Sequence, residues 1–247
     1  MRVLVGTSGF SYREWKGSFY PKDVRPAGFL RYYASRLPTV EINNTFYEAP
    51  KAPLVKGWMG EVPDAFVFAV KAPRTITHSL KLAKAGRPTR AFVKVVSRLG
   101  PRLGPLLFQL PPFFQKDVAR LDAFLRAMPP GPRVTFEFRH ASWFDDDVWA
   151  TLRAHGAALC VAEGEELVTP LIATADWGYV RLRKDRYSPA ALKKWALRLA
   201  EQPWKEAFVY IKHDDGDAPG VATRLARSLE RLEKLQVVER QEPTATE

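Results

Sequence analysis

The sequence is poor in cysteine and in long apolar runs. Its single cysteine, Cys160, cannot form a disulfide within the chain, and this favours a reducing compartment. No stretch approaches the about 20 apolar residues that a membrane-spanning helix needs. Residues 1–15 turn polar too early for the apolar segment of a secretory signal. We therefore expect a cytoplasmic protein without membrane contact, in which Cys160 is a small core residue.

Motifs that would identify a cofactor are also missing. The sequence has no Walker-type phosphate loop and no GxGxxG, and its four histidines show no HxxxH spacing. We therefore predict no cofactor and no metal. The weaker alternative is one divalent ion held by acidic and histidine side chains at strand ends. Its ligands would be Glu41, Glu137, His213 and Asp214.

Acidic residues are absent from residues 65–116, and this gap explains almost all of the formal net charge of +11. The segment carries only basic charge: Lys71, Arg74, Lys81, Lys84, Arg87, Arg90, Lys94, Arg98, Arg102 and Lys116. The rest of the chain is nearly neutral. Such a concentrated basic surface attracts anionic partners, so we expect an anionic small molecule or a nucleic acid. The alternative is a solvated helix face without a partner.

Asparagine is scarce, with Asn43 and Asn44 alone, whereas proline is abundant at 20 residues. This composition resembles that of a thermophile, although a GC-rich genome gives the same bias. Hydrophobic residues at 46% and charged residues at 26% are ordinary for a globular protein. The length of 247 residues suits one (β/α)₈ barrel, which typically has about 250 residues.

Eight short β-rich runs recur along the chain. They cover residues 2–6, 39–43, 66–71, 106–110, 134–138, 158–162, 179–182 and 208–212. Helical periodicity lies between them, at residues 26–37, 52–62, 88–100, 117–128, 146–156, 188–201 and 219–235. Only the stretch that follows residues 158–162 shows a weak helical pattern. The order predicts an α/β protein with one domain over residues 1–239, a (β/α)₈ TIM barrel with an eight-stranded parallel core. Residues 240–247 are predicted to form a frayed tail.

Polar residues alternate with apolar residues at the ends of these runs. Glu41 alternates with Val40 and Ile42, and Glu137 alternates with Phe136 and Phe138. Because helices cover the apolar side of a barrel strand, the polar side must face the lumen. The luminal set is Glu41, Asn43, Lys71, Gln109, Glu137, Arg139, Arg181 and Lys212. It lies at the C-terminal ends of the strands, where barrel enzymes hold their active sites. A purely structural network of salt bridges is the alternative.

Aromatic residues follow several of the same runs, and stacked rings beside cations suit bases or sugars. The loop aromatics include Phe10, Tyr47, Phe113, Phe114 and Phe144, and Trp177 precedes the seventh run. As ligand-binding candidates we select Tyr12, Trp15, Phe46 and Trp143. An apolar lid over the barrel is the alternative for each of them.

Two carboxylates and two histidines are the candidate catalytic groups. Glu41 or Glu137 would act as the general base, with His140 or His78 carrying protons. Lys71, Arg139, Arg181 and Lys212 would bind an anion, which predicts a hydrolase or lyase. Two alternatives remain: a non-catalytic nucleic-acid binding protein that uses residues 71–116, and a protein that binds a small anion or sugar. The sequence leaves the oligomeric state open, with a monomer favoured.

Seven blocks of the sequence resemble the YecE-like family of domains of unknown function. They are GTSGFSYREWKGSFYP, EINNTFYEAP, FVFAVKAPRTITH, FQLPPFF, FEFRHASWF, YVRLR and VYIKHDDGDAPGVA. The resemblance covers roughly residues 2–230 and implies a (β/α)₈ barrel, without supplying an activity. A distant likeness to barrels that act on damaged DNA is an analogy of fold alone. The chain departs from the family's pattern at Arg183 and Lys184 and at His213 and Asp214, all at the predicted mouth.

Overall fold

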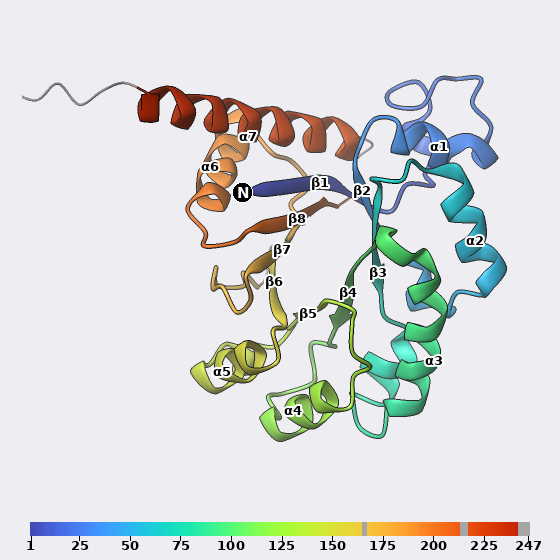
Figure 1. Ribbon diagram of the computed structural model, residues 1–247, viewed down its shortest axis with the longest axis vertical. Helices are drawn as coiled ribbons and strands as arrows, with labels where there is room; N and C mark the ends of the chain where they lie inside the picture. Colours follow the sequence, from blue (N-terminus) through green and yellow to red (C-terminus); the bar gives the residue numbers. More distant parts are fainter. Residues whose placement is uncertain (165–166, 213–216, 242–247) are drawn as a thin grey trace, which may run out of the picture.

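Eight parallel strands close into a barrel in the order β1 to β8, as the sequence predicts (Figure 1). The computed structural model describes residues 1–164, 167–212 and 217–241, with side chains described as far as residue 232. The strands are β1 (Arg2–Ser8), β2 (Thr39–Ile42), β3 (Val67–Lys71), β4 (Leu103–Gln109), β5 (Val134–Glu137), β6 (Ala158–Glu163), β7 (Trp177–Leu182) and β8 (Glu206–Ile211). Strand β8 pairs with β1 through six residues and closes the ring.

Helices surround the barrel on its outer side (Figure 1). They are α1 (Phe29–Ala34), α2 (Ala52–Glu61), α3 (Gly86–Val96), α4 (Val118–Arg126), α5 (Asp146–Ala154), α6 (Pro189–Ala200) and α7 (Ala218–Gln241). The side chains of Asp117 and Ser188 cap α4 and α6, which stabilises each helix start. Helix α7 packs against α6 and β1 and extends to Gln241, two residues past the predicted domain boundary. The remainder of the predicted tail lies outside the described residues.

Two connections differ from a simple strand–helix unit. The described part of the β6–β7 connection contains no helix, which agrees with the weak pattern there. The β3–α3 connection contains a π-helical turn, Thr75–Ser79, that the sequence did not predict. Lys81, Leu82 and Lys84 follow it with positive φ angles, a conformation that non-glycine residues rarely adopt. Both features lie on the C-terminal side of the barrel, where π-turns and backbone strain often accompany function.

The barrel lumen is filled by side chains that alternate with the helix-facing residues along each strand. An inner apolar cluster contains Leu4, Ala69, Leu107, Ala158, Cys160, Trp177, Tyr179, Phe208 and Tyr210. Cys160 is therefore a core residue, as expected, and burial raises the pKa of its thiol well above the ordinary value. The expectation that Trp177 joins aromatics at the mouth is wrong. It begins β7 and contacts Arg133, so it lies at the opposite end of the lumen.

Candidate functional site

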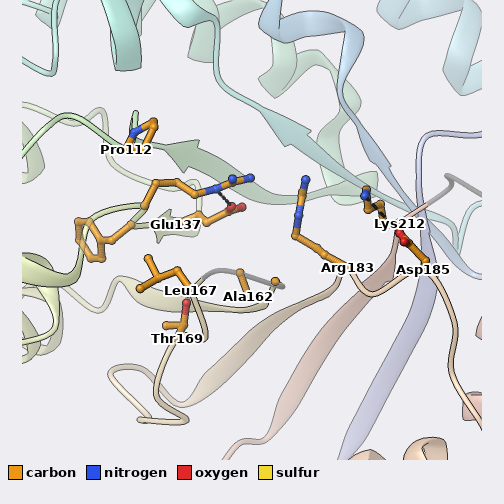
Figure 2. Close-up of a pocket in the computed structure, with 11 residues that line it drawn as sticks. Pro112, Glu137, Ala162, Leu167, Thr169, Arg183, Asp185 and Lys212 are labelled. Carbon is orange, nitrogen blue, oxygen red and sulfur yellow. Dashed lines mark hydrogen bonds and ion pairs between the residues drawn. The ribbon is translucent and has the colours of Figure 1, made fainter.

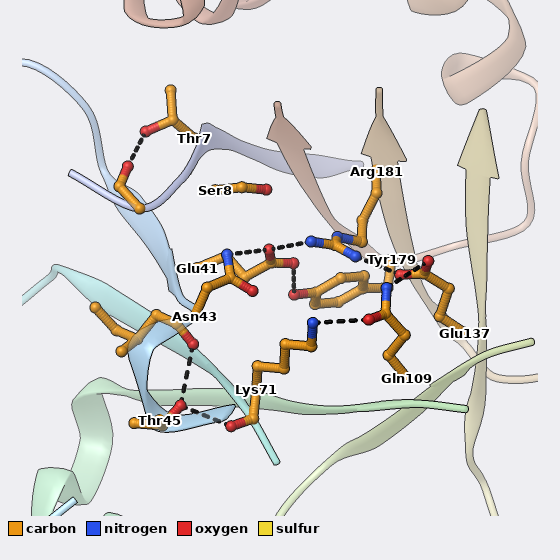
Figure 3. A network of polar contacts seen from close by, with 12 residues as sticks. Thr7, Ser8, Glu41, Asn43, Thr45, Lys71, Gln109, Glu137, Tyr179 and Arg181 are labelled. Carbon is orange, nitrogen blue, oxygen red and sulfur yellow. Dashed lines mark hydrogen bonds and ion pairs between the residues drawn. The ribbon is translucent and has the colours of Figure 1, made fainter. Parts of the chain in front are cut away.

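A buried arginine joins two buried glutamates at the C-terminal ends of the strands (Figure 3). Arg181 of β7 donates from Nη2 to Glu41 of β2 at 2.8 Å and from Nη1 to Glu137 of β5. Both glutamates are completely buried, and Arg181 is 3% exposed. Side chains along a barrel strand alternate between the lumen and the helix layer, and these three occupy positions that face the lumen. The three residues tie together strands from across the barrel.

Each glutamate has further donors, so all four carboxylate oxygens are engaged (Figure 3). Glu41 accepts from Asn43 at 2.9 Å and from the Tyr179 hydroxyl at 2.7 Å. Glu137 accepts from Arg139 at 2.6 Å and from Gln109 at 2.8 Å. Tyr179 was not among the predicted site residues. Tyr179 lies two residues before Arg181, so its side chain also faces the lumen. This spacing could have identified it.

These partners hold both carboxylates in the charged form. Burial alone would raise the pKa of Glu137, but the charges of Arg181 and Arg139 outweigh it and hold that pKa well below its usual range. The pKa of Glu41 is also lowered: burial opposes the shift, and Arg181 and the Tyr179 hydrogen bond cause it. A carboxylate with a depressed pKa is a weak base. The geometry therefore favours both glutamates as anchors for cations over the predicted role of general base.

Lys71 at the end of β3 completes the network without contacting a carboxylate (Figure 3). Its Nζ donates to Gln109 Oε1 at 2.7 Å and lies 4.1 Å from the centre of the Phe46 ring. Lys71 is 8% exposed. Burial lowers the pKa of Lys71 to about 8, helped by the charge of Arg181 and opposed by Glu137 and Glu41.

A cavity of about 410 Å³ adjoins this network, because Glu137 and Arg139 line it (Figure 2). Glu137 and Arg139 form one part of its wall, and Arg183, Asp185 and Lys212 form another. The remaining lining comes from Pro112, Phe138, Ala162, Gly164, Leu167 and Thr169. The structure thus brings all eight predicted luminal residues to one mouth, either in the network or on the cavity wall. Lys212 lies 3.8 Å from Asp185 and is half-buried.

Arg183 is the cation that the predicted site omitted. It rises from the end of β7 into the cavity (Figure 2), and within the described residues no hydrogen bond or ion pair to its side chain is found. Burial, together with the charges of Arg181 and Arg139, lowers the pKa of Arg183, although an arginine remains charged in proteins. In the segment YVRLR, Arg183 lies two residues after Arg181 and therefore on the same side of the strand. This alternation could have identified Arg183 as a site residue.

The loop that carries Arg183 is fixed by a carboxylate outside the cavity. Glu163 of β6 accepts from Lys184 Nζ at 2.7 Å, from the Tyr187 hydroxyl at 2.8 Å and from Trp195 Nε1 at 3.0 Å. Tyr187 in turn accepts from the backbone N–H of Lys184 at 3.1 Å. Arg183 and Lys184 therefore have different roles. Lys184 helps to hold the loop, and Arg183 adds positive charge to the cavity.

The two candidate histidines have different surroundings. His78 lies in the π-turn, where its ring contacts the Phe46 ring at 4.9 Å and its Nδ1 lies 2.9 Å from the Thr77 hydroxyl. Burial, followed by the charge of Lys71, lowers the pKa of His78, so the ring is neutral near pH 7. His140 instead caps the 3₁₀ turn Ala141–Trp143, because its Nδ1 accepts from the Ser142 N–H at 3.1 Å. We favour His78 over His140 for proton transfer.

The expectation that Trp15 and Trp143 line the mouth is wrong, because both are fully buried. Trp15 packs within an aromatic cluster beside Tyr12 and Tyr20. Trp143 stacks on Phe138 with centroids 4.6 Å apart and donates to the Phe114 carbonyl at 2.6 Å. Of the other two candidates, Tyr12 is half-buried and donates to the Ser8 carbonyl at 2.8 Å. Phe46 contacts the charged network directly, through Lys71.

The basic segment 65–116 reaches the mouth from the outer surface. Lys71 belongs to the charged network, while Arg102 and Lys116 pair with acids. Six further cations are exposed and form no ion pair within the described residues: Arg74, Lys84, Arg87, Arg90, Lys94 and Arg98. Along the chain these cations run from Arg74, which precedes the π-turn, through helix α3 to Arg98.

Metal binding finds no support in the described part of the chain. No group of three or more acidic, histidine or cysteine side chains there could hold a metal ion. Glu41 and Glu137 are occupied by Arg181, and the other two residues of the metal alternative, His213 and Asp214, lie outside the described residues.

None of the described helices is long and apolar enough to span a membrane.

The molecule is a (β/α)₈ barrel with a charged network and a cation-lined cavity at the C-terminal ends of its strands. The sequence profile described as "Protein of unknown function DUF72" matches residues 4–247. The chain belongs to this family.

Related proteins support the same assignment. The UPF0759 protein YecE of Escherichia coli is 34% identical over 127 residues, 51% of this chain and 47% of that protein, so the match spans about half of each. The UPF0759 protein YunF of Bacillus subtilis is 26% identical over 87% of this chain and 89% of its own length. A DUF72 family protein from Thermotoga maritima has a similar crystal structure, with a TM-score of 0.78 and 27% identity over 95% of this chain and 100% of that chain.

Proposed function

We propose that the barrel mouth binds a phosphate-bearing or other anionic ligand, and that the protein is a hydrolase or lyase. The observation that carries this proposal is the Arg183 guanidinium, which stands in the cavity without a hydrogen bond or ion pair from the described residues. A half-buried arginine without an anionic partner is costly, and a bound anion removes that cost. Arg139 and Lys212 on the same wall add to the positive charge.

Each charged group has a distinct role in this proposal. Arg139, Arg183 and Lys212 bind the anion, since all three line the cavity. Glu41 and Glu137 hold Arg181 and Arg139 in fixed positions, which supplies preorganised electrostatic stabilisation. His78 is the proton carrier, because it is neutral near pH 7 and contacts the same Phe46 ring as Lys71.

Replacing Arg183 by glutamine should weaken binding of inorganic phosphate about 10- to 100-fold, as hydrogen bonds to charged groups contribute about 1.5–3 kcal/mol. Isothermal titration calorimetry at pH 7 measures the affinity. The matched control is Arg153→Gln, in the last turn of α5, which should leave the affinity unchanged. Equal phosphate affinity in Arg183→Gln and the wild type would contradict an anion site at this cavity.

The second candidate function is nucleic-acid binding, favoured by the exposed cations of α3 and of the segment that leads to it. Single-stranded oligonucleotide should then bind with an affinity that falls steeply between about 50 and 200 mM salt, because each neutralised phosphate releases counterions. Fluorescence anisotropy measures this slope. The double variant Arg87→Gln, Arg90→Gln should reduce the slope by about 1–2. A slope near zero, or one that this variant leaves unchanged, would exclude the α3 surface as the binding track.

A further inference from the structure

Lys71 is separated from the acids of the network by a neutral amide. Its Nζ donates to the Gln109 side chain, which in turn donates to Glu137. Glu137 lines the cavity. Within the described residues no carboxylate lies within ion-pair distance of Lys71. The amine therefore lies beside the charged network, one amide away from the cavity-lining Glu137, without the direct acidic partner that would keep a lysine protonated.

An aromatic ring and a histidine lie beside the Lys71 amine. The face of Phe46 packs on Nζ, and His78 contacts the same ring from the π-turn. The charged groups that act on the amine are Arg181, Glu137, Glu41 and Arg183, in addition to its burial. With a pKa of about 8, about a tenth of the amine is neutral at pH 7, far more than for an ordinary lysine.

We propose that Lys71 is a nucleophile that forms an imine with an aldehyde or ketone carrying a phosphate group. The inference rests on the proposed function, because the cations of the cavity wall would hold the phosphate. The Nζ lone pair forms the carbon–nitrogen bond, and the carbonyl π electrons move to oxygen, which gains a proton. Nitrogen then loses its protons as the oxygen leaves as water, giving C=N. His78 donates and accepts these protons, and the step needs no oxidant or reductant.

Reductive trapping tests the imine on the wild-type chain. The protein is incubated at pH 7 with glyceraldehyde 3-phosphate and cyanoborohydride, which reduces an imine to a stable secondary amine, and labelled peptides are quantified by mass spectrometry. Lys71 should be labelled at least about tenfold faster than Lys84, an exposed lysine of the same segment. Glyceraldehyde without phosphate should label Lys71 at least about tenfold more slowly. In Lys71→Arg, shown by circular dichroism to be folded, the adduct at this position should be absent.

The outcomes separate the imine from the anion pocket. If inorganic phosphate binds and Arg183→Gln weakens it, but Lys71 is labelled no faster than Lys84, the imine is overturned and the pocket stands. If Lys71 is labelled rapidly by both aldehydes, and equally in Arg183→Gln, the amine is reactive and the phosphate pocket is overturned. Rapid labelling that requires the phosphate and Arg183 supports both.

Discussion

Replacing Arg181 by methionine should lower the free energy of unfolding by about 3–5 kcal/mol at pH 7. The change leaves Glu41 and Glu137 buried without the cation that they share. For a chain of this length the midpoint of thermal unfolding should fall by about 6–20 °C. Urea and thermal denaturation, followed by circular dichroism, measure both quantities.

The pH dependence of this loss has a defined sign. In the wild type the lowered pKa values of both glutamates contribute stability above the unfolded value of about 4.3, and this contribution is lost as the pH falls. Without Arg181, burial should raise the pKa of Glu41 above its unfolded value. The variant should therefore gain stability relative to the wild type as the pH falls from 7 towards 4. A constant difference across this range would contradict the ion-pair account.

A triple variant provides the matched control. Adding Glu41→Gln and Glu137→Gln to Arg181→Met removes both buried carboxylates that have lost Arg181 and should recover much of the lost stability, because neutral amides cost less to bury than carboxylates that lack this partner. Recovery in the triple variant assigns the loss to charge. A triple variant as unstable as Arg181→Met would assign it to packing instead.

Replacing Trp143 by alanine should lower the free energy of unfolding by about 3–5 kcal/mol, because a fully buried indole leaves a large cavity. The ring stacks on Phe138 and packs edge-on against Phe114, next to the end of β5. Trp143→Phe should cost less, since it keeps an aromatic face while losing the hydrogen bond to the Phe114 carbonyl. Urea denaturation at pH 7 measures these differences.

The same variants decide between packing and ligand contact for Trp143. If the indole contacted a ligand, Trp143→Phe would change phosphate affinity while leaving stability nearly intact. Packing predicts the reverse: stability falls and the affinity of the folded protein stays within about threefold. Exposed Phe113, on the neighbouring loop, is the control, because Phe113→Ala should change stability by no more than about 0.5 kcal/mol.

The positions of the charged residues were predictable because a strand has a period of two. Once Val40 and Ile42 face the helices, Glu41 must face the lumen, and the same logic places Glu137 and Arg181. The lumen is narrow, so side chains from opposite strands meet there. Sequence alone did not identify which acid pairs with which cation, because those contacts depend on the stagger of strands β2, β5 and β7.

The loop aromatics were not predictable in this way, because a loop has no fixed period. Trp15 and Trp143 both follow strands, yet each folds back into apolar packing, whereas Phe46 remains at the network. Composition indicates that a ring lies near the mouth and does not indicate which way it turns. The π-turn beside His78 was equally hidden, since its sequence, TITHS, has no distinctive turn residue.

Part of the cavity wall comes from the β6–β7 connection. Gly164, Leu167 and Thr169 line the cavity from a stretch whose described residues form no helix. Loops accept insertions and substitutions more readily than packed helices do. Evolution could therefore reshape the ligand that fits by lengthening this one segment, while the ion pairs that hold the strands together stay untouched. This part of the cavity wall and the ion pairs that join the strands lie in separate parts of the chain.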